Sequence, residues 1–188
     1  MFHVEQNNKY LHCDSKDYLV TGESFKVYLD ENKNIGKTIP VPEKGEMFKY
    51  YDSNQYLPHS HNKKNIITIL YSMIKRRMCR KKLEWMSRHL NHNSTVLDYG
   101  CGTGSFVKYL RAKSVMAYGY DPNIKFNLDS PDYLTNNFDW AGNKYDIIFL
   151  WHVLEHTHDP FLLLQSLKKR LNKNGKIFIA IPNFKSFD

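Results

Sequence analysis

The feature that most constrains the fold is an alternation of apolar runs and helix-forming segments after residue 94. The runs 95–98, 115–120, 145–150 and 176–181 have the length and the residue types of buried strands. Segments with helical patterns lie between the first and second runs and between the third and fourth. Such alternation predicts an α/β, Rossmann-like fold, in which helices cover both faces of a mostly parallel sheet.

Local signals predict where the helices lie. A long amphipathic pattern over 62–90 predicts the first helix, and 105–112 predicts a short second one. Asp159-Pro160 begins the third helix, with Asp as the N-cap and Pro at the first helical position. The stretch 122–143 shows no clear pattern and has room for one more strand.

Residues 1–61 differ in pattern and are expected to form an N-terminal arm, followed by a core over 62–188. Two short strands, 24–29 and 36–41, are joined by a turn-rich segment and predict a β-hairpin. A short helix is expected between residues 42 and 56. The aromatic and histidine residues near the end of the arm either cap an acceptor pocket or form a small core: Tyr51, Tyr56, His59 and His61.

Composition limits the class of protein. The chain has 188 residues, of which 41% are hydrophobic, enough for one core. No apolar run approaches the ~20 residues of a membrane span. The three cysteines contain no CxxC pair, so we expect no disulfide, no zinc site and a cytoplasmic location.

The net charge of +8 raises the question of a nucleic-acid partner. The densest basic cluster occupies 75–82, within the predicted helix over 62–90. It is either the solvated face of an amphipathic helix, which we favour, or a surface that binds RNA or phosphate.

A glycine-rich segment, 98–104, follows the first core strand. Glycines let a backbone turn sharply and approach a ligand closely. Asp121 ends the second core strand, where a carboxylate can accept both hydroxyls of a ribose. Ser105 stands where a dinucleotide fingerprint requires Gly or Ala, so a pyrophosphate ligand is disfavoured.

Four ordered segments within 83–183 resemble class I methyltransferases that depend on S-adenosylmethionine (SAM). Val96–Gly104 is similar to their first motif, and Gly119-Tyr120-Asp121 to their second. The residues from Tyr145 to His156 and from Leu171 to Ile179 are similar to later segments of that family.

The resemblance implies that Asp98 and the glycines hold the methionyl end of SAM and that Asp121 holds its ribose. An adenine slot would lie at 132–134 or 137–138. The residues expected to bind the cofactor SAM are Asp98, Tyr99, Gly100, Cys101, Gly102, Gly104, Asp121, Pro122 and Trp151.

His152, Glu155 and His156 follow the strand over 145–150 and are the expected catalytic residues. If they share one helical turn, all three lie on one face. The segment resembles the Leu-Glu-His segment of ubiquinone-biosynthesis methyltransferases, some of which have Glu where this chain has His152. Three roles stay open: a metal site, a histidine general base, or a loop that these residues cap. No metal is expected.

The resemblance also implies that this chain lacks the last two of the seven usual strands. We therefore expect a fragment of a longer methyltransferase that acts on a small molecule, preferably on an oxygen atom. The alternatives are an RNA or protein acceptor that uses the basic surface, and a non-catalytic SAM-binding module. The oligomeric state is left open.

Overall fold

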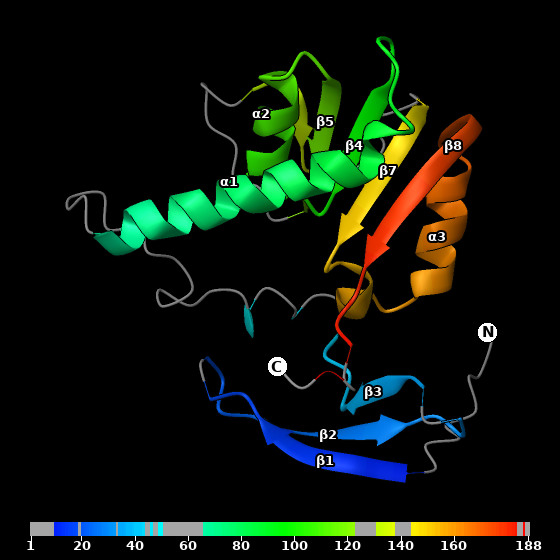
Figure 1. Ribbon diagram of the computed structural model, residues 1–188. Coiled ribbons are helices and arrows are strands. Elements are labelled where there is room, and N and C mark those ends of the chain that lie inside the picture. Colours follow the sequence, from blue (N-terminus) through cyan, green and yellow to red (C-terminus); the bar gives the residue numbers. More distant parts are fainter. Residues whose placement is uncertain are drawn as a thin grey trace. The chain divides into compact units, whose positions relative to one another are not determined.

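The structure is a computed structural model that forms two compact units (Figure 1). One unit is Lys64–Asn183, and the other is Met1–Lys63 with Phe184–Asp188. This division lies beside the boundary expected between residues 61 and 62. The residues that the structure describes are 10–18, 20–32, 34–43, 46, 49–50, 66–122, 131–137, 144–183 and 186.

The N-terminal unit contains an antiparallel sheet of β1 (Tyr10–Lys16), β2 (Ser24–Leu29) and β3 (Gly36–Ile39), in that order. The predicted hairpin of β2 and β3 is confirmed, and the Asp30 carboxylate closes its turn by accepting the N–H of Ile35 at 2.9 Å. Strand β1 was not predicted because all seven of its residues are exposed and show no apolar alternation.

The core unit contains a parallel sheet in the order β6-β5-β4-β7-β8. The predicted Rossmann-like fold is confirmed, and the unassigned stretch contains one more strand, β6. The strands are β4 (Thr95–Tyr99), β5 (Met116–Tyr120), β6 (Leu134–Thr135), β7 (Tyr145–Trp151) and β8 (Leu171–Ala180).

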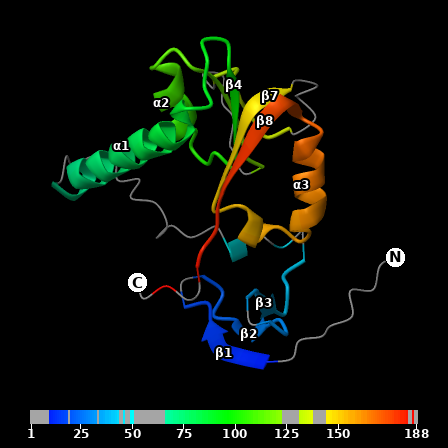
Figure 2. The ribbon, with the colours of Figure 1, turned by 45° about the vertical axis from the view of Figure 1, so that its right-hand side comes forward.

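Helices cover both faces of this sheet (Figure 2). Helices α1 (Ile66–Ser87) and α2 (Ser105–Arg111) pack on one face, and α3 (Pro160–Lys168) packs on the other. As expected, Asp159 caps α3, because its Oδ1 accepts the N–H of Leu162 at 2.9 Å. Among the described helices, none has the length and hydropathy needed to cross a membrane.

Alternation along β4 determines which side chains can reach each face. Val96 is fully buried in the core under α1 and α2, and Leu97 is buried in the core under α3. By the same period of two, Asp98 points to the α1 side and Tyr99 to the α3 side. The acidic residue of the glycine segment is thus directed into the space between β4 and α1.

Two predicted boundaries were wrong. β8 begins at Leu171 instead of residue 176, because Asn174-Gly175 forms an irregularity within the strand and not a turn before it. Asn174 has φ +68°, which Asn tolerates better than most residues. Helix α1 ends at Ser87, where the side-chain hydroxyl donates to Glu84 O at 2.8 Å.

Candidate functional site

The strand order reverses at β4, which pairs with β5 on one side and with β7 on the other. In open α/β sheets, ligands bind beyond the carboxyl ends of the strands at such a reversal. The glycine segment 98–104 leaves β4 at this end, and α2 begins directly after it. The fold therefore places the segment where a ligand site is expected.

Hydrogen bonds connect the glycine segment to the end of β5. The N–H groups of Gly100 and Cys101 both donate to Tyr120 O, at 2.7 and 3.0 Å. The N–H of Gly102 donates to Asp121 Oδ2 at 2.8 Å. The structure thus brings together the two features, the segment and the Asp121 carboxylate, that the sequence assigned to one ligand.

Gly100 and Gly102 of the segment both have a positive φ but differ in what surrounds them. Gly100 has φ +79°, and a Cβ there would collide with the side chain of Val153. Gly102 has φ +53°, and no atom lies within 4 Å of the position that its Cβ would take. Internal packing therefore requires glycine at position 100, whereas the backbone at position 102 is open to an incoming group.

A cavity of about 250 Å³ lies between α1 and the glycine segment. Of the expected cofactor-binding residues, five line it: Asp98, Gly100, Cys101, Gly102 and Trp151. The other lining residues were not predicted as site residues: Lys75, Met78, Cys79, Lys82, Thr103, Ser105 and Phe106.

The remaining expected cofactor-binding residues, Tyr99, Gly104, Asp121 and Pro122, are not among those that line the cavity. The Asp121 carboxylate contacts the segment by accepting the N–H of Gly102, and Pro122 follows Asp121 in the chain. The Cβ position of Gly104 is 2.7 Å from Leu134 Cδ1, so that glycine serves internal packing. The ring of Tyr99 packs on Tyr120, with centroids 4.7 Å apart, on the α3 side of the sheet. The Tyr99 side chain therefore does not face the cavity.

The cavity contains a buried carboxylate. Asp98 is 4% exposed, and burial raises its pKa to about 6, although the Lys82 ammonium opposes the rise. Within the described part of the chain, the Asp98 carboxylate accepts no hydrogen bond. Burial likewise raises the pKa of the Cys101 thiol, which keeps it protonated.

The interpretation of 75–82 as one solvated face was wrong for two of its lysines. Lys75 and Lys82 are half-buried and line the cavity, whereas Arg76, Arg77 and Lys81 are exposed. Lysines seven residues apart lie on the same side of a helix, so a run of six basic residues covers more than one face. The seven-residue spacing of Lys75 and Lys82 was the sequence signal that could have shown this.

The expected catalytic residues do not share one helical turn. His152 has φ +54° and precedes the short 3₁₀ turn η3 (Leu154–His156) that contains the other two. The His152 Nδ1 and Glu155 Oε1 atoms are 3.0 Å apart, so these two side chains form a hydrogen-bonded pair. Of the described residues, no three His, Cys, Asp or Glu side chains converge as metal ligands.

The candidates for an adenine slot have other contacts. Leu134 is 8% exposed and packs under Gly104 and Gly119. The Arg111 guanidinium lies 4.3 Å from the ring centroid of Tyr133. Asp132 and Asn137 are exposed, and Phe138 lies outside the described residues.

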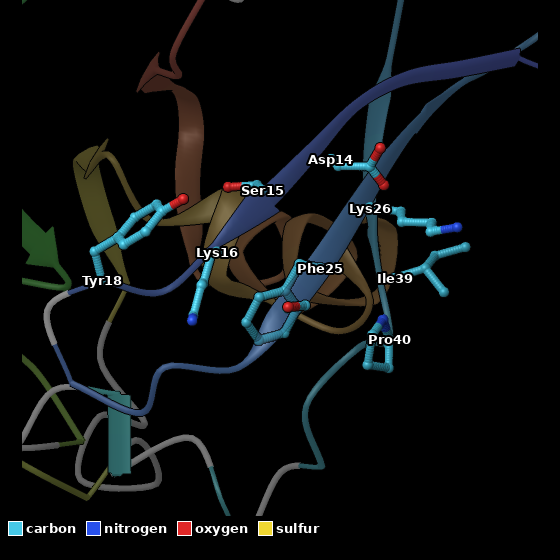
Figure 3. Close-up of a pocket in the computed structure, with 9 residues that line it drawn as sticks. Asp14, Ser15, Lys16, Tyr18, Phe25, Lys26, Ile39 and Pro40 are labelled. Atoms are coloured by element: carbon cyan, nitrogen blue, oxygen red, sulfur yellow. The ribbon is translucent and has the colours of Figure 1, made fainter.

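A larger hollow, of about 630 Å³, lies on the N-terminal sheet (Figure 3). Side chains of β1, β2 and β3 surround it, among them Lys16, Phe25 and Ile39. It contains none of the residues that the sequence assigned to chemistry. The residues expected to cap an acceptor pocket lie outside the described residues: Tyr51, Tyr56, His59 and His61.

A parallel sheet with a glycine segment at its strand reversal defines a Rossmann-like nucleotide-binding domain. A family model described as "Methyltransferase domain" matches residues 71–186, which include the whole glycine segment and the His152–Glu155 pair. The chain therefore belongs to this methyltransferase family, whose class I members depend on SAM.

Curated relatives and solved structures agree with this family. A tRNA U34 carboxymethyltransferase from Campylobacter lari is 27% identical over 184 residues, which are 84% of this chain and 55% of the relative. One from Campylobacter jejuni subsp. doylei is 32% identical over 106 residues, 45% of this chain and 34% of that relative. The chain thus matches between a third and just over half of their length.

The magnesium protoporphyrin IX methyltransferase of Synechocystis, solved with bound SAM, has the same fold. It aligns with a TM-score of 0.51 and 17% identity, over 72% of this chain and 75% of that protein.

Proposed function

We propose that the Lys64–Asn183 unit binds SAM against the glycine segment and transfers its methyl group to an acceptor. The observation that carries this proposal is that three features meet at the carboxyl ends of β4 and β5. The buried Asp98, the open backbone at Gly102 and the Asp121 carboxylate meet there beside a cavity.

The residues present fit SAM. A buried carboxylate such as Asp98 suits the α-ammonium group of a methionyl tail, and the Asp121 carboxylate suits ribose hydroxyls. The open backbone at Gly102 lets a ligand approach the segment closely. When bound, SAM supplies an electrophilic methyl group on its sulfonium.

We propose His152 as the general base for an acceptor that must lose a proton. The Glu155 carboxylate accepts a hydrogen bond from Nδ1–H, which fixes the ring and leaves Nε2 as the atom that receives a proton. This orientation makes His152 a better candidate than His156.

For the acceptor we propose RNA, although the sequence favoured a small-molecule oxygen. The curated relatives are named as tRNA-modifying enzymes, and the exposed basic residues of α1 stand next to the cavity wall. Exposed Arg76, Arg77 and Lys81, with the half-exposed ring of Trp85, combine positive charge with an aromatic surface. The small-molecule acceptor is the alternative.

Cofactor binding is tested by calorimetry with S-adenosylhomocysteine (SAH). The wild-type chain is expected to bind it, and Asp121→Ala should weaken binding by about 10- to 100-fold through the loss of charged hydrogen bonds. Asp159→Ala, which removes an exposed carboxylate at the start of α3 in the same unit, is the matched control. No binding by the wild type at millimolar SAH would refute the proposal.

The acceptor is tested with bulk tRNA and a panel of small-molecule hydroxyls, with radiolabelled SAM as donor. Transfer to tRNA is expected, and mass analysis of the product must score both methyl and carboxymethyl groups because of the relatives' name. His152→Gln should slow transfer by about 10²–10⁴-fold, while exposed His92→Gln should not. SAH binding without transfer to any acceptor would indicate a non-catalytic module.

The basic face is tested by RNA binding at increasing salt. Replacing Arg76 and Arg77 together by Gln should weaken binding and reduce its salt dependence. The matched control is Lys168→Gln with Lys169→Gln, which removes two exposed charges at the end of α3. Equal effects of the two double variants would argue for a small-molecule acceptor.

We also propose the cytoplasm as the site of action. Cys13, Cys79 and Cys101 are all free thiols, which suits a reducing compartment. Cell fractionation that finds the chain in another compartment would contradict this.

A further inference from the structure

Trp85 of α1 and Trp151 at the end of β7 form a pair of stacked indoles. Their ring centroids are 5.4 Å apart, and the angle between their planes is 17°. Trp151 also meets the imidazole of His152 edge to face, with centroids 5.8 Å apart and planes at 88°. The Trp151 ring therefore contacts both the Trp85 indole and the histidine proposed as the general base.

The stack leaves much of Trp85 in water. Trp85 is 50% exposed, whereas Trp151 is partly buried and lines the cavity. Trp85 is not among the residues that line the cavity, so its exposed surface lies outside the proposed SAM site. A flat aromatic surface in water suits a flat aromatic ligand, because stacking removes apolar surface of both partners from water.

Positive charges flank the exposed indole along the chain. Lys81 lies one helical turn before Trp85, and Arg88 lies three residues after it. The N–H of His89 donates to Met86 O, so the helical turn continues past Arg88. Lys81 and Arg88 are both exposed, and neither pairs with an acidic residue within the described ranges. Both cations are thus available to anionic groups on either side of the indole.

A single-stranded segment of RNA offers both kinds of partner, since its unpaired bases stack on aromatic rings and its phosphates bind cations. We propose that the exposed indole of Trp85 stacks on an unpaired nucleobase of the acceptor RNA, while Lys81 and Arg88 bind the adjoining phosphates. This inference rests on the proposed function, because it specifies how the proposed RNA acceptor is held. It makes single-stranded or looped RNA, and not a duplex, the form that the protein recognises.

The test separates base stacking from phosphate binding. The probes are a single-stranded oligouridylate and a ribose-phosphate chain of the same length without bases, each with a fluorescent label. Fluorescence anisotropy measures their binding to the full chain. Trp85→Leu keeps an apolar side chain but removes the aromatic face. Tyr71→Leu is the matched control, because Tyr71 is another exposed aromatic residue of α1, at 56%.

The wild type and Tyr71→Leu should bind the oligouridylate about 5- to 100-fold more tightly than the base-free chain, the range expected for stacking of one base. Trp85→Leu should lose this preference, because its affinity falls for the oligouridylate and not for the base-free chain. Its salt dependence should remain that of the wild type, since an indole releases no counterions. Trp85→Phe, which keeps a smaller aromatic face, should retain part of the preference.

Two results would overturn the inference and leave the proposed RNA acceptor standing. In one, Trp85→Leu keeps the wild-type preference for the oligouridylate. In the other, it loses affinity equally for both probes. SAH calorimetry on the same samples separates the remaining case: a wild type that binds SAH and neither probe refutes the RNA acceptor together with this inference, but not the binding of SAM.

Folding of the variants is checked by urea unfolding followed by circular dichroism. If Trp85→Leu does not fold, Trp85→Phe and the wild type still decide. A wild type that binds both probes equally, or a folded Trp85→Phe whose preference exceeds that of the wild type, would overturn the inference.

Discussion

Asp98→Asn should stabilise the core unit near neutral pH while it weakens binding of SAH. Asn has nearly the shape of the neutral carboxyl group, so the variant resembles the protonated wild type at every pH. The unfolded carboxyl group has a pKa of 3.8, and burial raises the folded value to about 6.

The sign of the effect follows from proton binding. Between these two pKa values the folded chain binds more protons than the unfolded chain, so the wild type loses stability as the pH rises through this window. A pKa difference of about two corresponds to about 3 kcal/mol. Above about pH 6 the folded chain keeps the ionised Asp98 buried, and the full cost is present.

The assay is urea unfolding followed by tryptophan fluorescence. All three tryptophans of the chain, at positions 85, 140 and 151, belong to the core unit. The free energy of unfolding of Asp98→Asn should exceed that of the wild type by up to about 3 kcal/mol at pH 7, and the two should converge near pH 4. Asp132→Asn, at an exposed carboxyl, is the control.

A stability difference that is the same at pH 4 and pH 7 would contradict this prediction, because it would show that ionisation of Asp98 is not the source of the difference. A less stable Asp98→Asn at pH 7 would show that the carboxylate has a stabilising partner in the folded chain. The SAH affinity of the same variant separates the two roles: it should fall even though stability rises.

Two other predictions concern local geometry. Gly100→Ala should destabilise the core unit by about 2–5 kcal/mol in urea unfolding, through a positive φ and a collision with Val153, whereas Gly102→Ala should cost only about 1–2 kcal/mol yet lower SAH affinity by calorimetry. Equal stability losses would contradict the open space at position 102. Asp159→Ala should lower stability by about 1 kcal/mol through loss of the α3 cap, without any change in SAH affinity.

The sequence was sufficient for the parts of the fold that depend on local pattern. The apolar run that became β7 is buried on both faces, and the Asp-Pro start of α3 was correct because cap chemistry is local. The same locality explains why β1 was missed: its seven exposed residues are held by pairing with β2, a contact that no pattern within the strand reveals.

The candidate site was predictable where motif and strand end coincide, and less so elsewhere. The spacing of 98–104 and Asp121 indicated one site, and a hydrogen bond joins them. That Tyr99 points away from the cavity follows from strand alternation, which the motif alone does not consider. The inward position of Lys82 depends on how α1 packs against the sheet, and a run of basic residues does not specify that rotation.

We propose that the glycine segment and Asp121 bind SAM together. An NMR titration of the isotope-labelled chain with SAH tests this at the residues concerned. We expect the backbone amide resonances of Cys101, Gly102 and Asp121 to move with increasing SAH, while those of β2 and β3 do not. Unmoved resonances in the glycine segment, or shifts confined to the hollow on the N-terminal sheet, would contradict it.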